Sequence, residues 1–183
     1  MKMLLALLTL LLAGFAFPTS GRAQQPRTAS EWVALCDSRS ENRQFDFWLG
    51  TWDVYEGGEK VAESRIERLA GSCAILETYS QPDGYSGKSI NFFDATLGKW
   101  RQIWVDEVGT VSEFAGAVKE RMMRFEGRTH TRDGKEILRK MEVSAGDADS
   151  VRQYSERSDD GGRSWSVAYD LHYRRHAPEA STR

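Results

Sequence analysis

Short runs rich in β-branched and aromatic residues, each about 8–12 residues long, dominate the chain from Phe45 onward. Turn-forming segments separate these runs: YEGGEK, QPDGYSG, ATLGK, DEVGT, KERM, RDGKE, SAGDADS and SDDGGRS. Helical patterns are missing between the runs, which argues against a parallel sheet and predicts about nine to ten antiparallel strands joined by hairpins. Because such a meander must protect its edges, we expect one all-β, antiparallel up-and-down β-barrel; a two-sheet sandwich is the alternative.

Period-two alternation within the runs predicts which side chains face the barrel interior. In KWRQIWVD, the residues Trp100, Gln102 and Trp104 share one face. The last run, SWSVAYDLHYRR, has an apolar set in phase and a more polar set opposite it. The apolar set is Trp165, Val167, Tyr169, Leu171 and Tyr173, and the opposite set is Ser166, Ala168, Asp170, His172 and Arg174. We expect the apolar set to face inward, so that His172 points to solvent.

The N-terminus has the pattern of a signal peptide. Lys2 precedes an apolar run from Met3 to Phe17, and Gly21 and Ala23 take the small-residue positions before a cleavage site. The run is shorter than the roughly 20 apolar residues of a bilayer-spanning helix, and an uncleaved anchor is the alternative. We therefore expect a periplasmic or secreted protein. Its predicted parts are a signal peptide (1–23), an N-terminal segment (24–44) with a short helix capped by Ser30, a barrel (45–176) and a disordered tail (177–183).

Charge excludes one class of partner. Without Lys2 and Arg22 the exported chain has 23 basic and 27 acidic residues, and its basic residues form no stripe. Nucleic-acid binding is therefore not expected. After signal cleavage no other apolar stretch suggests contact with a membrane.

Two cysteines, Cys36 and Cys73, remain in the exported chain. An even pair in an exported protein favours a disulfide, which would stabilise the fold by about 3–4 kcal/mol in the chain-entropy model. Two buried free thiols are the alternative. A zinc site is disfavoured because two cysteines without a nearby histidine pair supply half of the usual ligands, and we expect neither a metal nor a cofactor.

The stretch FDFWLGTWDV carries Gly50-x-Trp52 where the strand runs begin. This spacing resembles the G-x-W signature of lipocalin-like (calycin) barrels. The resemblance implies that Trp52 plugs one end of the barrel beneath an arginine from the last strand. Arg174 or Arg175, in LHYRR, stands in the matching place.

The chain also resembles an uncharacterised bacterial family of small exported barrels, a domain-of-unknown-function family. The matching elements occur in the family's order: Phe45–Trp52, Gly71–Glu77, Gly87–Ser89, Trp100–Asp106 and Ser158–Trp165. The resemblance to lipocalins and nitrobindins is more distant. Nitrobindin-like barrels bind haem iron through a late-strand histidine, but alternation places His172 outside, and His130 and His176 fall in polar segments. The family implies a barrel with an internal ligand site and no established activity.

Polar residues on predicted inward faces are the candidate ligand site, because burying them costs free energy unless a partner satisfies them. With the neighbouring aromatic residues they form the set Glu77, Asn91, Gln102, Trp104, Tyr154 and Glu156. Aromatic walls with a few convergent polar groups are typical of small-molecule sites. The alternative is a structural network in a filled barrel, in which Glu77 pairs with an inward arginine such as Arg124 or Arg152.

Three functions of different classes follow. The first is an exported barrel that binds a small, partly apolar ligand. The second is a structural or interaction protein with a filled barrel, and the third is an enzyme that uses Glu77 and Glu156 as an acid/base pair. Nucleophile elbows, P-loops and dinucleotide-binding motifs are missing, so we rank enzymes last. We expect a monomer or a small homo-oligomer.

The segment SERSDDGGRSW resembles the Asp-box of sialidase propellers, but a propeller needs several blades and this motif occurs once. We interpret it as a hairpin in which Asp160 accepts hydrogen bonds from backbone N–H groups of the turn. Gly161 and Gly162 permit positive φ, Ser164 adds a local bond, and Trp165 begins the final strand on its inward face.

Overall fold

The computed structural model describes residues 28–120, 122–147 and 149–177. The predicted signal peptide (1–23) and residues 178–183 of the predicted tail lie outside the described residues. In the part of the chain that is described, no helix is long and apolar enough to cross a membrane.

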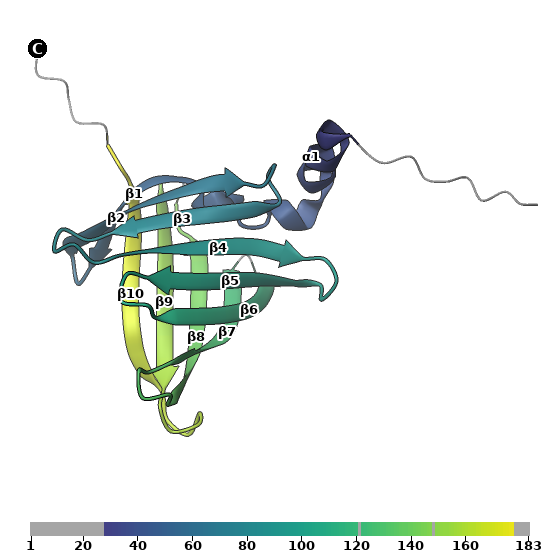
Figure 1. Cartoon of the computed structure of the whole chain (residues 1–183). Coiled ribbons are helices and arrows are strands. Elements are labelled where there is room, and N and C mark those ends of the chain that lie inside the picture. Colours follow the sequence, from purple (N-terminus) through teal and green to yellow (C-terminus); the bar gives the residue numbers. More distant parts are fainter. Residues whose placement is uncertain (1–27, 121, 148, 178–183) are drawn as a thin grey trace, which may run out of the picture.

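Ten antiparallel strands close into one barrel in which each strand pairs with its neighbours in sequence and β1 also pairs with β10 (Figure 1). The strands are β1 (Gly50–Glu56), β2 (Glu59–Leu69), β3 (Ala74–Ser80), β4 (Ser86–Asp94), β5 (Lys99–Asp106), β6 (Val111–Lys119), β7 (Met122–His130), β8 (Glu136–Ala145), β9 (Ser150–Ser158) and β10 (Ser166–Arg175). This confirms the predicted up-and-down barrel and excludes the sandwich.

The eight recognised turns imply nine strands, and the tenth comes from a turn that the residue types do not mark. It joins β2 to β3, where Ala70, Gly71 and Ser72 have φ values of 52°, 60° and 70°. Only one of these three is glycine, the residue type that favours this conformation. Residues 60–80 therefore look like one long run in the sequence.

A short helix, α1 (Ala29–Ser38), precedes the barrel and lies outside its wall (Figure 1). Thr28 caps it, since the Thr28 side chain accepts from the Glu31 backbone N–H while the Glu31 side chain accepts from the Thr28 N–H. The expectation that Ser30 is the cap is therefore wrong by two residues. The reciprocal bond with glutamate at the third helical position favours Thr28.

The disulfide Cys36–Cys73 joins α1 to the β2–β3 turn, with the two Cα atoms 5.0 Å apart. This confirms the predicted bridge. The N-terminal segment is thus covalently tied to one end of the barrel.

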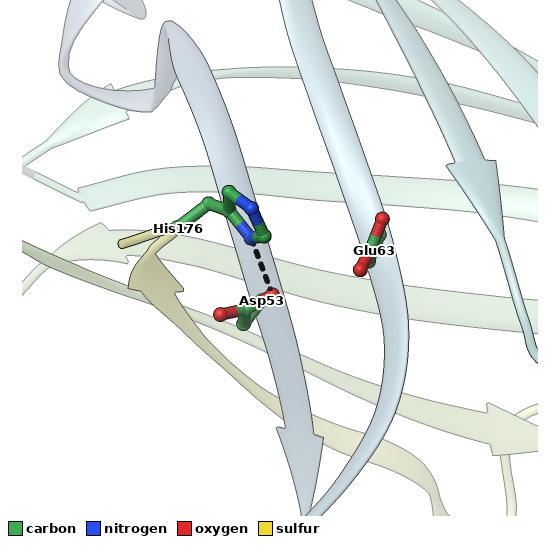
Figure 2. Close-up of side chains that lie close together, drawn as sticks. All are labelled: Asp53, Glu63 and His176. Atoms are coloured by element: carbon green, nitrogen blue, oxygen red, sulfur yellow. Dashed lines mark hydrogen bonds and ion pairs between the residues drawn. The ribbon is translucent and has the colours of Figure 1, made fainter. Parts of the chain in front are cut away.

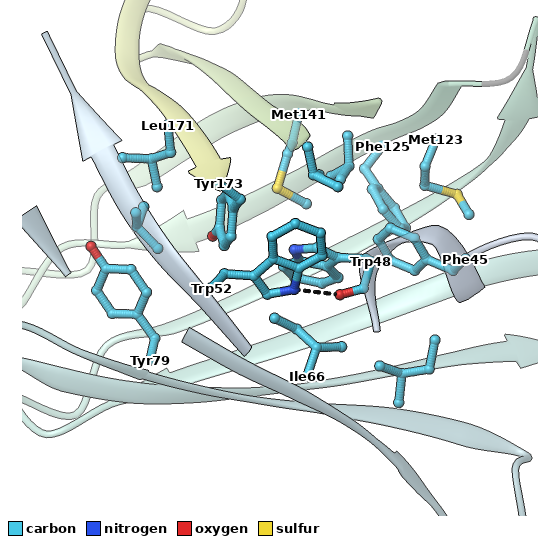
Figure 3. Close-up of a cluster of buried hydrophobic side chains, with 14 of the residues drawn as sticks. Phe45, Trp48, Trp52, Ile66, Tyr79, Met123, Phe125, Met141, Leu171 and Tyr173 are labelled. Carbon is cyan, nitrogen blue, oxygen red and sulfur yellow. Dashed lines mark hydrogen bonds between the residues drawn. The ribbon is translucent and has the colours of Figure 1, made fainter. Parts of the chain in front are cut away.

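Two 3₁₀ helices, η1 (Ser40–Arg43) and η2 (Asp46–Trp48), lead into β1, and η2 fills that end of the barrel. Phe45 and Trp48 are fully buried and stack with their ring centroids 5.0 Å apart. The Trp52 indole N–H donates to the Trp48 carbonyl at 2.8 Å (Figure 3). Packed aromatic rings, with the Trp52 indole N–H hydrogen-bonded to the backbone, therefore close this end of the barrel.

Arg175 covers the outside of this aromatic plug. Its guanidinium carbon lies 3.9 Å from the Trp52 ring centroid, and Nη1 donates to the Leu49 carbonyl at 2.7 Å. Gly50 passes so close that a Cβ there would lie 1.8 Å from Arg175 Nη1. Of the two arginines considered for this place, Arg175 stacks on Trp52, and Arg174 lies over the Tyr55 ring.

A β-bulge in β10 changes the phase of the last strand. The β9–β10 register shifts between Val167 and Tyr169, so Ala168 is the extra residue. Leu171 and Tyr173 are buried as expected. On the other side of the bulge Val167 pairs with Glu156 and is 58% exposed.

The bulge also corrects the placement of Trp165. This residue precedes β10, and the Lys140 ammonium lies 3.9 Å from its ring centroid. Since Lys140 is exposed between the inward-facing Arg139 and Met141, Trp165 lies on the outer side of the barrel, and its predicted inward position is wrong. His172 is exposed beside Asp170, which confirms that it points to solvent.

Candidate functional site

A cavity of about 620 Å³ occupies the barrel at the end opposite η2. Its lining comes from most of the strands and from the turns between β3 and β4 and between β5 and β6. The residues with aromatic or apolar character are Val61, Tyr79, Tyr85, Trp104, Phe114, Val167, Ala168, Tyr169, Leu171 and Tyr173. The polar and charged ones are Glu56, Glu77, Gln81, Gln102, Asp106, Thr110, Ser112, Arg139, Gln153 and Arg157. The barrel is therefore packed at one end and hollow at the other.

Glu77 on β3 lies at the floor of the cavity, with 3% of its surface exposed. Its Oε1 accepts from the Ser64 hydroxyl at 3.0 Å, and its Oε2 accepts from the Ser89 hydroxyl at 2.8 Å. Burial raises the pKa of Glu77 to about 7, although hydrogen bonds from Ser89, Ser64 and Tyr173 oppose that rise. Near neutral pH this carboxyl group is thus divided between its neutral and charged forms.

The polar network continues from Glu77 toward β5. Asn91 Nδ2 donates to the Ser89 hydroxyl at 2.9 Å, and Gln102 Nε2 donates to Asn91 Oδ1 at 2.8 Å. Asn91 is fully buried, and its register partner on β5 is Gln102. Each amide orients the next group, so the Glu77 carboxyl is held in one position.

A second branch runs from Glu77 toward β9 and β10. The Tyr173 hydroxyl lies 3.3 Å from Glu77 Oε1 and 2.7 Å from Gln153 Oε1. Gln153 Nε2 in turn lies 3.4 Å from the Tyr169 hydroxyl. The polar floor therefore spans the cavity from β5 to β10.

Aromatic residues form the wall above this floor. Trp104 lies across Gly87, where a Cβ would approach the indole to 2.3 Å, and packs edge-on against Tyr79 at 5.9 Å. Nearer the mouth, the Tyr85 hydroxyl donates to Asp106 at 3.0 Å. Burial, together with the Asp106 carboxylate, raises the pKa of Tyr85 to about 12, which keeps this hydroxyl protonated.

Four of the six predicted ligand-site residues belong to this region. Glu77, Gln102 and Trp104 line the cavity, and Asn91 lies behind them in the same hydrogen-bond network. The predicted inward phase of β3, β4 and β5 is therefore the observed one.

Tyr154 and Glu156 lie on the outer face, which corrects their predicted inward position. The inward residues of β9 are Val151, Gln153 and Ser155, all buried, and Tyr154 and Glu156 alternate with them. The Tyr154 hydroxyl donates to Glu156 at 3.3 Å. With Glu156 outside, Glu77 and Glu156 do not share a cavity, and the acid/base pair of the enzyme hypothesis is lost.

The predicted salt-bridge partners of Glu77 are also elsewhere. Arg124 pairs with Glu142 at 3.0 Å, and Arg152 pairs with Asp170 at 2.7 Å, both in partly exposed positions. Hydroxyl and phenol groups hold Glu77 instead.

Arg139 and Arg157 are two charged residues of the cavity lining that lie outside the set predicted from the sequence. Within EILRKMEVSA, Arg139 is in phase with Ile137, Met141 and Val143, which are buried. The presence of a cationic residue among inward-facing apolar residues was the sequence signal that could have placed Arg139 in the barrel interior. Arg157 is the register partner of Arg139, and without the β8–β9 pairing nothing in the sequence indicates that it faces the cavity.

A cluster of titratable side chains lies outside the barrel. One side-chain oxygen or nitrogen of each of Asp53, Glu63 and His176 lies within 4.8 Å of the others (Figure 2). His176 Nδ1 lies 2.9 Å from Asp53 Oδ1. The Lys60 ammonium lies 2.7 Å from the same Asp53 oxygen and 2.8 Å from Glu63 Oε1. Since Lys60 bridges both carboxylates, this cluster is an ion-pair network that fastens the end of β10 to β1 and β2.

Comparison with known proteins adds little. No family model matches the chain, and no curated protein matches it. Among solved structures, the chain is similar to the protein of "Structure of EF1p2_mFAP2b bound to DFHBI", at 13% identity over 75% of this chain and 100% of that chain. The TM-score is 0.33, a level of similarity that does not bear on function.

Proposed function

We propose that this chain is an exported protein that binds a small, partly apolar molecule inside its barrel. The observation that carries the proposal is the cavity of about 620 Å³ that reaches Glu77 and Trp104. Its volume lies within the roughly 300–1,000 Å³ of small-molecule sites. A filled barrel, the alternative expected from sequence, has no such space.

The lining supports a ligand with both apolar and polar parts. Trp104, Phe114 and Leu171 offer aromatic and aliphatic surface, whereas Glu77 and Gln102 offer oriented hydrogen-bonding groups. A few fixed polar groups within an apolar wall set the orientation of a bound molecule. A pure hydrocarbon would make no hydrogen bond with these groups.

Export to the periplasm or the medium belongs to the proposal. It is supported by the signal-peptide pattern of residues 1–23 and by the Cys36–Cys73 disulfide, which persists in oxidising compartments. Membership of the uncharacterised family of exported barrels rests on the motifs between Phe45 and Trp165. Native mass spectrometry of protein from the exporting cell tests binding, and sequencing of its N-terminus tests cleavage after Ala23.

A matched pair of substitutions on β6 sharpens the binding test. Ser112 is buried in the cavity lining, and Glu113 beside it faces out, with its side chain 60% exposed. We expect a co-purified molecule on the wild type and on Glu113→Trp, and none on Ser112→Trp, whose indole would project into the cavity and obstruct it. Apo protein in all three samples, together with no binder in a small-molecule screen, would contradict the proposal.

An interaction role is the second candidate, because the outer face carries apolar residues. Ile90, Val105 and Val111 are 43%, 47% and 45% exposed, and Val105 pairs directly with Val111. Sedimentation velocity of the wild type and of Val105→Lys tests self-association through this face. Concentration-dependent dimers that Val105→Lys abolishes would favour the second candidate, and a monomer in both cases would remove self-association.

A further inference from the structure

Two arginines lie side by side on the cavity wall. Arg139 on β8 and Arg157 on β9 are direct register partners, and both line the cavity. Directly opposed residues on antiparallel strands have Cβ atoms about 4.5–5.5 Å apart, and like charges in such pairs are destabilising. Arg139 is half-buried and Arg157 is exposed, so water screens part of the repulsion between the two guanidinium groups. An anion between or above them would remove more of it.

The barrel does not supply that anion. Among residues 28–120, 122–147 and 149–177, no carboxylate lies within ion-pair distance of Arg139 or Arg157. The three carboxylates that line the cavity have other partners. Glu77 accepts from Ser64 and Ser89, Asp106 accepts from Tyr85 and from backbone N–H groups of its turn, and Glu56 accepts from the Asp170 N–H.

Arg139 is nevertheless held in place by neutral groups. Its Nη2 donates to the Ser155 hydroxyl at 3.0 Å, and Ser155 donates its own proton to the Lys140 carbonyl. The guanidinium carbon lies 5.4 Å from the Tyr169 ring centroid. The Nε–H is enclosed and has no acceptor among the described residues, so the protein uses only part of the donor set of this side chain.

We propose that Arg139, assisted by Arg157, binds the carboxylate of a small aromatic or aliphatic acid whose apolar body lies against Trp104 and Phe114. This inference rests on the proposed function and names the ligand class of the same cavity. A planar guanidinium matches a carboxylate in two parallel hydrogen bonds, and such charge-assisted bonds are strong where water is excluded. A monoanion is favoured because Glu77 and Asp106 also line the cavity and would oppose a second negative charge.

Two nearly isosteric probes, 2-naphthoate and 2-naphthamide, test the acid requirement by isothermal titration calorimetry at pH 7. For the wild type we expect 2-naphthoate to bind at least about tenfold more tightly than 2-naphthamide. In Arg139→Gln this preference should disappear while the amide affinity stays within about threefold, and Arg157→Gln should show an intermediate loss. Arg128→Gln is the matched control, because it removes one positive charge from an exposed position on β7 that pairs with Glu136.

Thermal unfolding separates a binding role from a structural one. If Arg139 is a ligand anchor, removing it relieves the like-charge pair, so the unfolding midpoint of ligand-free Arg139→Gln should equal or exceed that of the wild type. A clear fall in the midpoint would assign Arg139 to structure and overturn the proposal.

The remaining outcomes are distinct. Equal binding of acid and amide by the wild type would overturn the acid requirement and leave the proposed function standing. An acid preference that persists in Arg139→Gln would overturn the assignment to Arg139. If neither probe binds while native mass spectrometry finds another ligand, the acid proposal alone fails; if neither probe nor any ligand is found, both proposals fail.

Discussion

Glu77 is the titratable group at the cavity floor, and its neighbours can satisfy both of its protonation states. Tyr173 has one hydroxyl proton and two acceptors near it, and the distances of 2.7 Å to Gln153 and 3.3 Å to Glu77 favour Gln153 as the acceptor. The Tyr173 oxygen can then accept a hydrogen bond from the O–H of neutral Glu77. The neutral carboxyl is thus satisfied by the same neighbours that hold its charged form.

The raised pKa of Glu77 predicts a pH-dependent stability. Between its ordinary value of 4.5 and the folded-state pKa of about 7, the native protein binds more protons at Glu77 than the unfolded chain does. The Glu77 contribution to the free energy of unfolding therefore falls as pH rises through this window and levels off above it. Glu77→Gln mimics the neutral carboxyl and does not titrate. From pH 5 to pH 8, its free energy of unfolding relative to that of the wild type should therefore rise by on the order of 3 kcal/mol.

Urea unfolding of both proteins across this pH range is the measurement, with Glu113→Gln as the control for losing one acidic residue from the outer face. Parallel stability curves for wild type and Glu77→Gln would show that Glu77 keeps an ordinary pKa in the folded state.

At the scale of elements, the hairpin between β9 and β10 shows how local chemistry forms a turn without entering the cavity. Asp160 Oδ1 accepts from the backbone N–H groups of Arg163 and Ser164 at 2.9 Å and 3.0 Å, and the Ser164 hydroxyl donates to Oδ2 at 2.6 Å. These local bonds hold the pKa of Asp160 well below its usual range. Gly161 and Gly162 have φ values of 75° and 90°, as the turn interpretation requires.

We expect Asp160→Ala to lower the thermal unfolding midpoint by a few degrees, because four hydrogen-bond donors in and beside the turn lose their acceptor. Binding of 2-naphthoate should not change, since Asp160 does not line the cavity. Asp159→Ala, at the exposed neighbouring position, is the control. Unchanged thermal stability with lost binding would refute the structural role of Asp160.

The aromatic plug at the closed end of the barrel depends on glycine at position 50. Gly50 has a φ of 131° and lies where Arg175 crosses to the Leu49 carbonyl. Gly50→Ala should lower the free energy of unfolding by about 2–4 kcal/mol, because it combines backbone strain with displacement of the guanidinium from Trp52.

Gly98→Ala is the matched control, since Gly98 has a φ of 62° and a Cβ there would meet nothing within 4 Å. It should cost only about 1 kcal/mol. Chemical denaturation of both variants gives the comparison, and equal losses would mean that the Arg175 contact adds nothing to the plug.

For the whole molecule, closure removes the sheet edges, and the plug leaves a barrel that is packed at one end and hollow at the other. The Cys36–Cys73 disulfide fastens the chain before the plug to the barrel wall. The aromatic plug and the cavity therefore occupy opposite ends of one barrel, so the cavity does not interrupt the packing of the plug.

Replacing both cysteines, in Cys36→Ser/Cys73→Ser, should lower the free energy of unfolding by about 3–4 kcal/mol, because the unfolded chain regains the freedom of a 37-residue interval. Urea unfolding of the oxidised wild type and the double variant measures the loss. Reducing agent should weaken the wild type alone. A loss of less than about 1 kcal/mol would show that the bridge joins segments already close in the unfolded chain.

The residue pattern by itself determined the barrel, since period-two alternation and turn residues are local properties that each hairpin expresses independently. The same local evidence placed Glu77, Asn91, Gln102 and Trp104 on inward faces. The even cysteine count beside a signal-peptide pattern favoured the disulfide, and the resemblance of Gly50-x-Trp52 to a known motif implied the Trp52 plug.

Only the tertiary structure decided the features that depend on register. The bulge at Ala168 moved Trp165 to the outer side and left Val167 exposed, and one inserted residue leaves no mark in an alternating pattern. The pairing of Arg139 with Arg157, and the exclusion of Glu156 from the cavity, follow from how β8, β9 and β10 align. Side chains far apart in the chain meet only when the barrel closes, so the cavity and the two neighbouring arginines on its wall are properties of the folded molecule.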